Sequence, residues 1–240
     1  MGCQFLEKAQ MTDLELAAML IAASCHDLQH FGVNNQFLIE SKHDFALRYN
    51  DESVLENHHV ATAFKFINEE DTAIFERLSI EDYKDIRKKM ISMVLATDMG
   101  KHMQDAVNFK NRLAAEDFAP DGEDKVMCMG QVVHMADLNN PTKPWKVSYN
   151  WTGILYIEFF DQGDKEKELG LPIGMLMDRD TVNIAEKTLG FVSFVIKPAY
   201  ESFAEFLPGA QLNLDTMEDN KSQWEQCAPI FQERMERGDS

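Results

Sequence analysis

Cys25-His26-Asp27-Leu28-Gln29-His30-Phe31-Gly32 is the part of this 240-residue chain that points most directly to a fold. It places two imidazoles and a carboxylate within five positions, directly after an apolar run from Leu14 to Ala23. In a helix, His26 and His30 share a face because they are four residues apart, and Asp27 lies about 100° around from His26. Polar groups at the end of a buried helix need partners, and a metal ion is one such partner. The stretch therefore predicts a helical protein with a metal centre.

Helix-start signals precede the segments that carry histidines. The apolar run predicts a helix buried on nearly every side, because Leu, Ile, Met and Ala fill almost all of its positions. Thr12 and Glu15 make a capping-box pattern, which is typical of the first turn of a helix. Ser53 and Glu56 repeat that pattern ahead of a second histidine-bearing segment. Both segments are therefore predicted to be helices.

Most of the seven histidines fall in groups at the inner ends of amphipathic segments: His26, His30, His58, His59 and His134. One such histidine is more often a core residue held by backbone or carboxylate groups, but scattered core histidines are not expected to group in this way. Since His58 and His59 are adjacent, we expect no more than one of them to face inward. His43 and His102 have no polar partner nearby and are expected at the surface.

Composition excludes several classes of protein. The chain is 45% hydrophobic, enough for one large core, and nothing in its composition marks a second domain. A net charge of −18 without a basic run excludes a broad nucleic-acid surface. Four widely spaced cysteines form no CxxC pair, which favours a reducing interior, and we expect a cytoplasmic protein. The longest apolar run, 16–24, is too short to span a membrane.

Helical periodicity dominates the chain, and strand-like alternation does not persist beyond a few residues. The predicted helices span Thr12–Cys25, Ser53–Glu69, Ile80–Thr97, Gln104–Ala115, Lys125–Asp137, Trp145–Gly163, Asp180–Ile196, Pro198–Leu207 and Lys221–Glu236. The polar, acidic segment beyond Pro208 is expected to be a linker through Asn220. The helix after it, with Trp224 and Phe231, is expected to dock loosely or not at all.

An ordered series of motifs follows the opening histidines. They read His26-Asp27-x-x-His30-x-Gly32-x-x-Asn35-x-Phe37-Leu38-Ile39, Tyr49-Asn50-Asp51-x-Ser53-Val54-Leu55-Glu56-Asn57-His58-His59, Leu95-Ala96-Thr97-Asp98-Met99, His134-x-Ala136-Asp137-x-x-Asn140-Pro141-Thr142-Lys143-Pro144 and Glu158-Phe159-Phe160-x-Gln162-Gly163-Asp164. With them the chain resembles the catalytic domain of class I cyclic nucleotide phosphodiesterases, within the HD-type metal phosphohydrolases. The resemblance implies an all-α, multi-helix fold over residues 12–208, between a short segment at 1–11 and an acidic linker with a C-terminal helix at 209–240.

The resemblance also implies a chemistry. Members of this family open the 3′ ester of cAMP or cGMP with a hydroxide that bridges two divalent metal ions, zinc at the tighter site and magnesium or manganese at the second. Three side chains would bind the tighter ion: His26, Asp27 and Asp137. A further set would hold the water molecules of the second ion, with support from His59: His30, Glu56 and Thr97. The metal ions would let a strongly acidic protein bind an anionic substrate.

The same resemblance implies a nucleotide pocket that contains Asn140, Leu155, Thr188 and Phe191. Leu155 and Phe191 would clamp the base between them. By pattern alone, a phenylalanine placed like Phe191 is more often a core residue of its helix than part of a binding pocket. Thr188 stands where the family has a glutamine that reads the purine edge. Its single hydroxyl cannot make that paired hydrogen bond, so we expect weaker nucleotide binding and less discrimination between cAMP and cGMP.

A second departure concerns the family's upstream His-Asn-x-x-His-Ala helix, which supplies the general acid and a fourth metal ligand. This chain has no histidine before His26, so we expect an N-terminally incomplete domain, its C-terminal two thirds, with the general acid missing. Three hypotheses remain open: a cyclic nucleotide phosphodiesterase, a catalytically impaired binding module of the same family, and an HD-type enzyme with another substrate. An apolar face of 14–23 left without its packing partner is expected to cause self-association.

Overall fold

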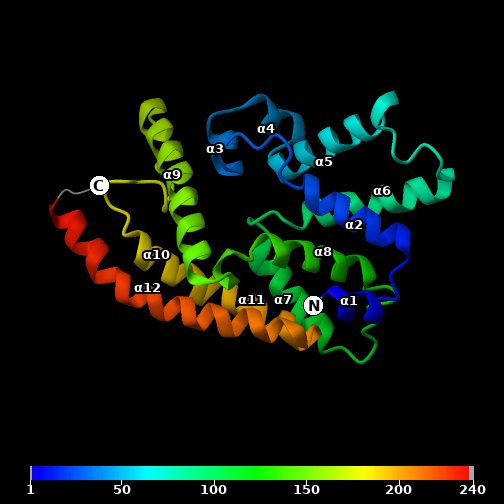
Figure 1. The fold of residues 1–240 in the computed structure, drawn as a ribbon. Coiled ribbons are helices and arrows are strands. Elements are labelled where there is room, and N and C mark those ends of the chain that lie inside the picture. Colours follow the sequence, from blue (N-terminus) through cyan, green and yellow to red (C-terminus); the bar gives the residue numbers. More distant parts are fainter. Residues whose placement is uncertain (1, 238–240) are drawn as a thin grey trace. The chain divides into compact units, whose positions relative to one another are not determined.

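The structure is a computed structural model that describes residues 2–237, with side chains from Gln4 onward, and the described residues form helices and no strand (Figure 1). The α-helices are α1 (Gly2–Lys8), α2 (Asp13–Cys25), α3 (Asn35–Glu40), α4 (Asp44–Tyr49), α5 (Val54–Ile67), α6 (Ile80–Leu95), α7 (His102–Leu113), α8 (Lys125–Asp137), α9 (Trp145–Leu169), α10 (Ile184–Phe191), α11 (Lys197–Phe206) and α12 (Gln211–Arg237). Short 3₁₀ helices lie at Glu70–Thr72, Asn140–Thr142 and Pro208–Ala210, and a π-helical turn at Val192–Ile196 joins α10 to α11. The predicted all-α class is therefore confirmed.

The described chain divides into two compact units. Unit 1 contains the residues up to Phe31 and Lys42–Asp137, and unit 2 contains Gly32–Ser41 and the residues from Leu138 onward. The predicted domain boundaries at residues 12 and 208 stay a prediction.

In unit 1, α6 is the central helix and packs against α2, α5 and α8. Its inward face carries Ile86, Met90, Met93 and Val94, all fully buried. These positions follow helical spacing, so one apolar stripe of α6 faces the core, while most of its charged residues face solvent and Lys89 is largely buried against Glu15 of α2.

Helix α2 begins as predicted but is less buried than predicted. Thr12 and Glu15 form both hydrogen bonds of the capping box. Ala18 and Ala22 are fully buried, yet Leu20 is 58% exposed. The expectation of burial on nearly every side was therefore wrong, because α2 approaches its neighbours through its small alanines and leaves the opposite apolar face outward.

Unit 2 is organised around α12, which packs against α9, α10 and α11. The helix begins at Gln211, not Lys221, and its inward face buries Leu214, Met217 and Trp224. Trp224 contacts Trp145 edge-on, with ring centroids 4.9 Å apart. The expected acidic linker is thus part of a docked helix, and its acidic residues occupy the outward face.

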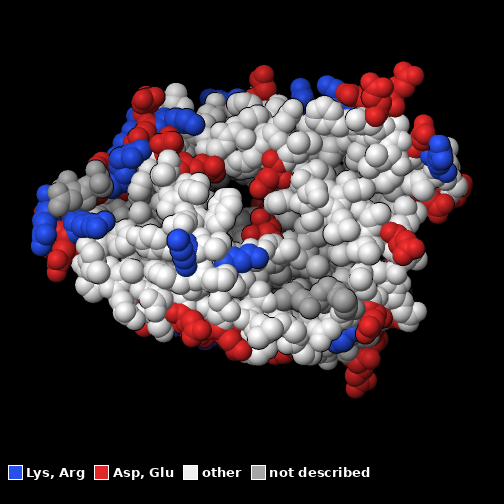
Figure 2. Space-filling model, in the orientation of Figure 1, with Lys and Arg blue, Asp and Glu red and all other residues white. Residues whose placement is uncertain are grey.

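Charged side chains are unevenly distributed. Figure 2 shows Lys and Arg gathered near the C-terminal ends of α9 and α12, and singly or in small groups elsewhere on this face. Lys167 pairs there with Asp178 and Asp180, and Arg179 with Asp164, so part of this positive charge is neutralised locally. None of the described helices is both long enough and apolar enough to cross a membrane.

Candidate metal centre and nucleotide pocket

His26, Asp27 and Asp137 come together in unit 1, where α2 and α8 end. His26 Nε2 lies 3.1 Å from Asp137 Oδ1 and 3.2 Å from Asp27 Oδ2. On the other side of the ring, Nδ1 donates to the carbonyl oxygen of Ala23 at 2.8 Å. That hydrogen bond fixes the ring orientation and leaves Nε2 as the ligand atom, the arrangement common for metal-binding histidines.

The electrostatics of this cluster favour a cation. Hydrogen bonds to Asp137 and Asp27 raise the pKa of His26 to about 11, although burial acts in the opposite direction. The hydrogen bond to His26 likewise lowers the pKa of Asp27 against the effect of burial. A divalent ion bound to His26 Nε2 would displace the proton from that nitrogen and supply the positive charge in its place.

The donor set fits a divalent metal ion. The three side chains each offer one ligand atom, and these atoms lie within 4.8 Å of one another. His59 adds an independent indication, because its Nδ1 donates to Leu28 O at 2.7 Å and a neutral ring then has a lone pair on Nε2. This Nε2 lies 3.8 Å from Asp27 Oδ1. Two acceptor atoms that face each other are stabilised by a proton or a cation between or beside them.

The residues predicted to hold metal-bound water also lie in unit 1. His30 is exposed and its ring lies 5.8 Å from that of His59. Glu56 and Thr97 are buried, and the Thr97 hydroxyl donates to Val94 O at 2.8 Å. Their roles around a second metal ion stay a prediction.

The predicted capping box at Ser53 and Glu56 was wrong. Ser53 has a left-handed backbone (φ 43°), and its side chain makes no capping hydrogen bond. Its hydroxyl instead donates to Asp98 Oδ2 at 2.6 Å and accepts from Lys101 Nζ at 2.7 Å. Long-range polar partners have therefore replaced the local cap.

Two predictions about histidines were also wrong. His58 and His59 are both buried, at 8% and 1% exposed, because α5 is enclosed on adjacent sides. His102 is 2% exposed, and its Nδ1 lies 2.8 Å from His134 Nε2. Burial and the nearby His102 lower the pKa of His134 to about 4, which keeps that ring neutral. His43 is exposed as predicted, although its Nδ1 also caps α4 by accepting from Phe45 N.

The predicted nucleotide-pocket residues lie in unit 2. Asn140 Nδ2 donates to Thr152 Oγ1 at 3.1 Å, while its Oδ1 is buried without a hydrogen-bond partner among the described residues. An orphaned buried acceptor of this kind is costly unless a ligand or water donates to it. Leu155 on α9 is 41% exposed, and Phe191 at the end of α10 is half-buried, so both have surface left to contact a ligand.

Thr188 has a different environment from that of a base-reading residue. It is buried at 8% exposed, and its hydroxyl donates to Ile184 O one turn earlier at 2.7 Å. The same hydroxyl forms a side-chain hydrogen bond with Tyr156, which is 4% exposed. Burial raises the pKa of Tyr156, and its hydrogen bond with Thr188 acts in the opposite direction. Thr188 therefore links α9 to α10.

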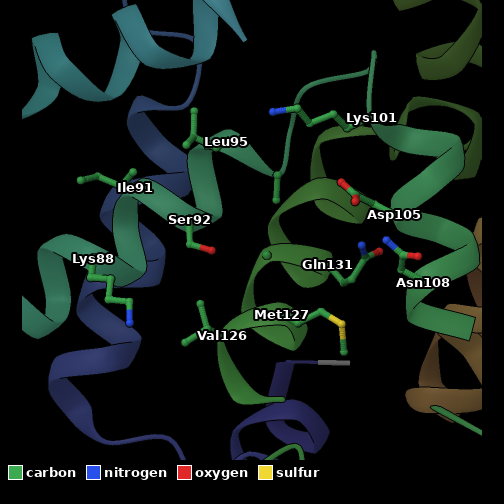
Figure 3. A pocket seen from close by; sticks show the side chains of 12 residues that line it. Lys88, Ile91, Ser92, Leu95, Lys101, Asp105, Asn108, Val126, Met127 and Gln131 are labelled. Atoms are coloured by element: carbon green, nitrogen blue, oxygen red, sulfur yellow. The ribbon is translucent and has the colours of Figure 1, made fainter. Parts of the chain in front are cut away.

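A separate pocket of about 580 Å³ lies among α6, α7 and α8 in unit 1. Figure 3 shows Ile91, Leu95 and Val126 on one side of it, and Asp105, Asn108 and Gln131 on the other. None of the predicted site residues lines it.

Comparison with known proteins identifies the family. The sequence profile of the 3′5′-cyclic nucleotide phosphodiesterase family matches residues 2–217. The chain belongs to this family.

Two solved structures are similar over 95% of the chain, both with a TM-score of 0.87. One is the phosphodiesterase domain of the RhoPDE fusion protein from the choanoflagellate Salpingoeca rosetta, at 32% identity and with 74% of that chain covered. The other is the phosphodiesterase domain of Salpingoeca rosetta rhodopsin phosphodiesterase, at 33% identity and with 70% covered. The predicted resemblance and the predicted phosphodiesterase catalytic-domain fold are both confirmed.

Proposed function

We propose that this chain hydrolyses the 3′ ester of cAMP, cGMP or both to the 5′-monophosphate, in the cytoplasm. The observation that carries the proposal is the convergence of His26, Asp27 and Asp137 on one point, in a member of the phosphodiesterase family. Cyclic nucleotides are anions, and a chain with net charge −18 binds them best where cations are held.

The residues present define how two metal ions would be held. His26 Nε2 and one oxygen each of Asp27 and Asp137 would bind the tighter ion, which we propose is zinc, and Asp27 would also serve the second, magnesium or manganese. When bound, such ions supply a hydroxide at neutral pH and neutralise phosphoryl oxygens. The Ala23 carbonyl holds the His26 ring in its ligating orientation. His30, Glu56 and Thr97 would hold metal-bound water.

In the nucleotide pocket, Asn140 would use its unpartnered Oδ1 to accept a hydrogen bond from the base. Leu155 and Phe191 would flank the base, a contact that does not choose between purines. Since the Thr188 hydroxyl is engaged by Ile184 and Tyr156, it adds little selectivity.

The direct test is a hydrolysis assay of the purified chain with added zinc and magnesium, using cAMP and cGMP separately. We expect 5′-monophosphate to form, and a chelator or Asp137→Asn to abolish it. Asp13→Asn removes an exposed carboxylate on α2 and serves as the matched control. Hydrolysis that is unaffected by the chelator would contradict the proposal.

A second candidate is a binding module of the same family that holds a metal ion or nucleotide without turnover. The engaged hydroxyl of Thr188 favours it, because the purine edge is then read less strongly. Calorimetric binding of cAMP or cGMP with no product after long incubation would support this candidate. Metal-dependent turnover that Asp137→Asn abolishes would exclude it.

A further inference from the structure

The turn that carries the metal ligands has an unfavourable backbone at Gln29. Its φ is 63°, in the left-handed region that residues with a side chain rarely adopt. Gln29 lies two residues after Asp27, inside the stretch that presents His26 and Asp27. Something must therefore hold this turn in place if the ligand atoms are to stay together.

The two adjacent histidines of α5 hold the turn at successive residues. His59 Nδ1 donates to the backbone carbonyl of Leu28 at 2.7 Å. His58 Nε2 donates to the side-chain carbonyl of Gln29 at 3.0 Å. Both rings are buried.

The His58 ring is itself fixed by aromatic neighbours. It stacks on Phe45 with centroids 4.0 Å apart and planes 24° apart, and it contacts Phe31 at 5.7 Å. Burial, together with the charge of Arg48 and the nearby His43, lowers the pKa of His58 and keeps it neutral. A neutral ring with one fixed N–H is a directional donor, which suits a residue that holds another group in position.

We propose that His58 is a positioning residue of the metal centre, which stabilises the left-handed conformation of Gln29 and so keeps His26 and Asp27 in ligating geometry. The inference deepens the proposed function, because it assigns a role at the same site to a residue that touches neither metal ion nor nucleotide. Outer residues that orient metal ligands typically change metal affinity about 10- to 100-fold when lost.

The first experiment measures Mn²⁺ affinity of the metal-free protein by calorimetry, together with backbone hydrogen exchange at Leu28 and His30. These two amides donate to Cys25 O and Asp27 O, so their protection reports on the turn itself. His58→Phe keeps an aromatic ring against Phe45 but removes the donor. We expect Mn²⁺ binding to weaken about tenfold and exchange at both amides to accelerate.

Two further variants separate positioning from packing. His58→Gln retains an N–H donor and should recover most of the affinity. Gln29→Gly removes the backbone strain, so His58→Phe in that background should change Mn²⁺ affinity by less than about twofold. Tyr49→Leu, which removes another ring beside Phe45 and leaves the hydrogen bond between His58 and Gln29 in place, is the matched control and should leave both readouts near wild type.

The outcomes are distinct. If His58→Phe leaves exchange at Leu28 and His30 unchanged, or acts equally strongly with Gly at position 29, the positioning role is refuted. A second result is that the wild type binds no Mn²⁺ or Zn²⁺ while the His58 variants change amide exchange as expected. This result would refute the proposed metal-dependent function and support the role of His58 in the turn.

Discussion

At the scale of single residues, Thr188 shows most clearly that the residue type alone does not reveal the surroundings of a side chain. The resemblance implies only that threonine stands where the family has a glutamine. The structure adds that the replacing hydroxyl is buried and already has two partners, Ile184 and Tyr156. The position to which the resemblance assigns base reading is therefore occupied by a contact between helices.

Thr188→Val tests this interpretation, because valine keeps the shape and removes the hydroxyl. We expect the KM for cAMP and cGMP to change by less than about twofold, while stability falls by about 1 kcal/mol from the lost hydrogen bonds. Thermal unfolding and steady-state kinetics measure the two effects. A tenfold rise in KM with unchanged stability would show that the hydroxyl contacts the nucleotide.

At the scale of elements, α9 and the segment after it are held by one buried polar group and one close backbone approach. Gln162 accepts from Asn34 N and donates to Glu166 Oε1, and Glu166 in turn accepts from Gly174 N at 2.8 Å. Next to them, a Cβ at Gly163 would lie 1.9 Å from Met177 O. Position 163 therefore has room only for glycine.

Gly163→Ala should destabilise the protein by about 3 kcal/mol, since a backbone carbonyl cannot move aside as a flexible side chain does. Gly153→Ala is the matched control on the same helix, with nothing within 4 Å of the added Cβ. It should stabilise by up to about 1 kcal/mol through helix propensity. Urea denaturation of both variants measures the contrast, and equal effects would refute the close approach.

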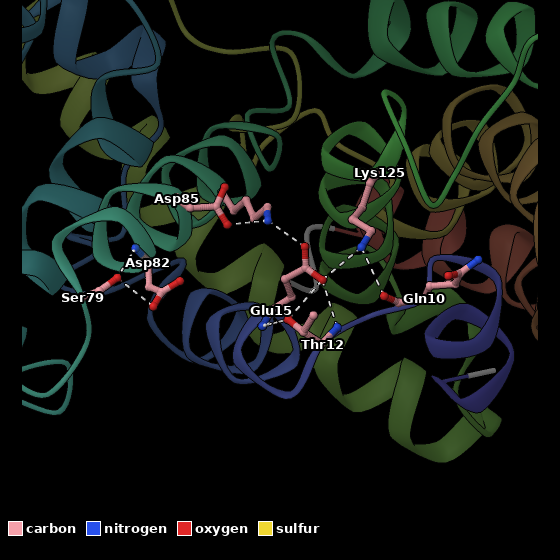
Figure 4. Close-up of polar contacts among 8 residues, drawn as sticks. Gln10, Thr12, Glu15, Ser79, Asp82, Asp85 and Lys125 are labelled. Atoms are coloured by element: carbon pink, nitrogen blue, oxygen red, sulfur yellow. Dashed lines mark hydrogen bonds and ion pairs between the residues drawn. The ribbon is translucent and has the colours of Figure 1, made fainter.

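A second link between helices consists of ion pairs that connect Glu15 of α2 to α6 and α8, as Figure 4 shows. Lys89 lies 2.6 Å from one carboxylate oxygen and Lys125 lies 3.1 Å from the other. Burial alone would raise the pKa of Glu15, but the hydrogen bonds from Lys89, Thr12 and Lys125 outweigh it and lower the pKa to about 2.

The pH dependence follows from the lowered pKa of the folded state. The stabilisation from Glu15 is present above its ordinary pKa of 4.5 and is lost as pH falls from there toward about 2. We expect Glu15→Gln to lower the free energy of unfolding by about 3 kcal/mol at pH 7. The difference from wild type should shrink below pH 4.5. Urea denaturation across this pH range tests it. Asp85→Asn, which removes a more exposed partner of Lys89, should cost no more than about 1 kcal/mol.

At the scale of the whole molecule, apolar surface remains on the outward face of α2. Leu20 is 58% exposed, and Leu16 and Ala23 on the same face are half-buried. Contiguous apolar surface on a soluble protein favours association.

We expect self-association that increases with concentration and is reduced by Leu20→Lys. Sedimentation velocity over a range of concentrations is the measurement. Ile80→Lys, at a similarly exposed position at the start of α6, is the control and should leave association unchanged. A monomer at all concentrations in the wild type would contradict the expectation.

Local features could be predicted from the sequence more reliably than contacts between residues far apart in the chain. The capping box at Thr12 was found because its two partners are three residues apart, and the grouping of His26, Asp27 and Asp137 was found because the motifs carry it. The prediction of a capping box at Ser53 was wrong because the Ser53 hydroxyl has Asp98 and Lys101 as partners. Both lie more than forty residues away in the chain.

The sequence by itself determined the helical class, the family and the three candidate metal ligands, since these depend on spacing and order along the chain. Tertiary structure alone decided that His58 and His102 are buried, that Thr188 links two helices and that α12 docks from Gln211 onward. It also decided the left-handed backbone at Gln29. The physical reason is that burial and backbone strain depend on which distant segments of the chain come into contact. The spacing of residues along the sequence does not specify those contacts.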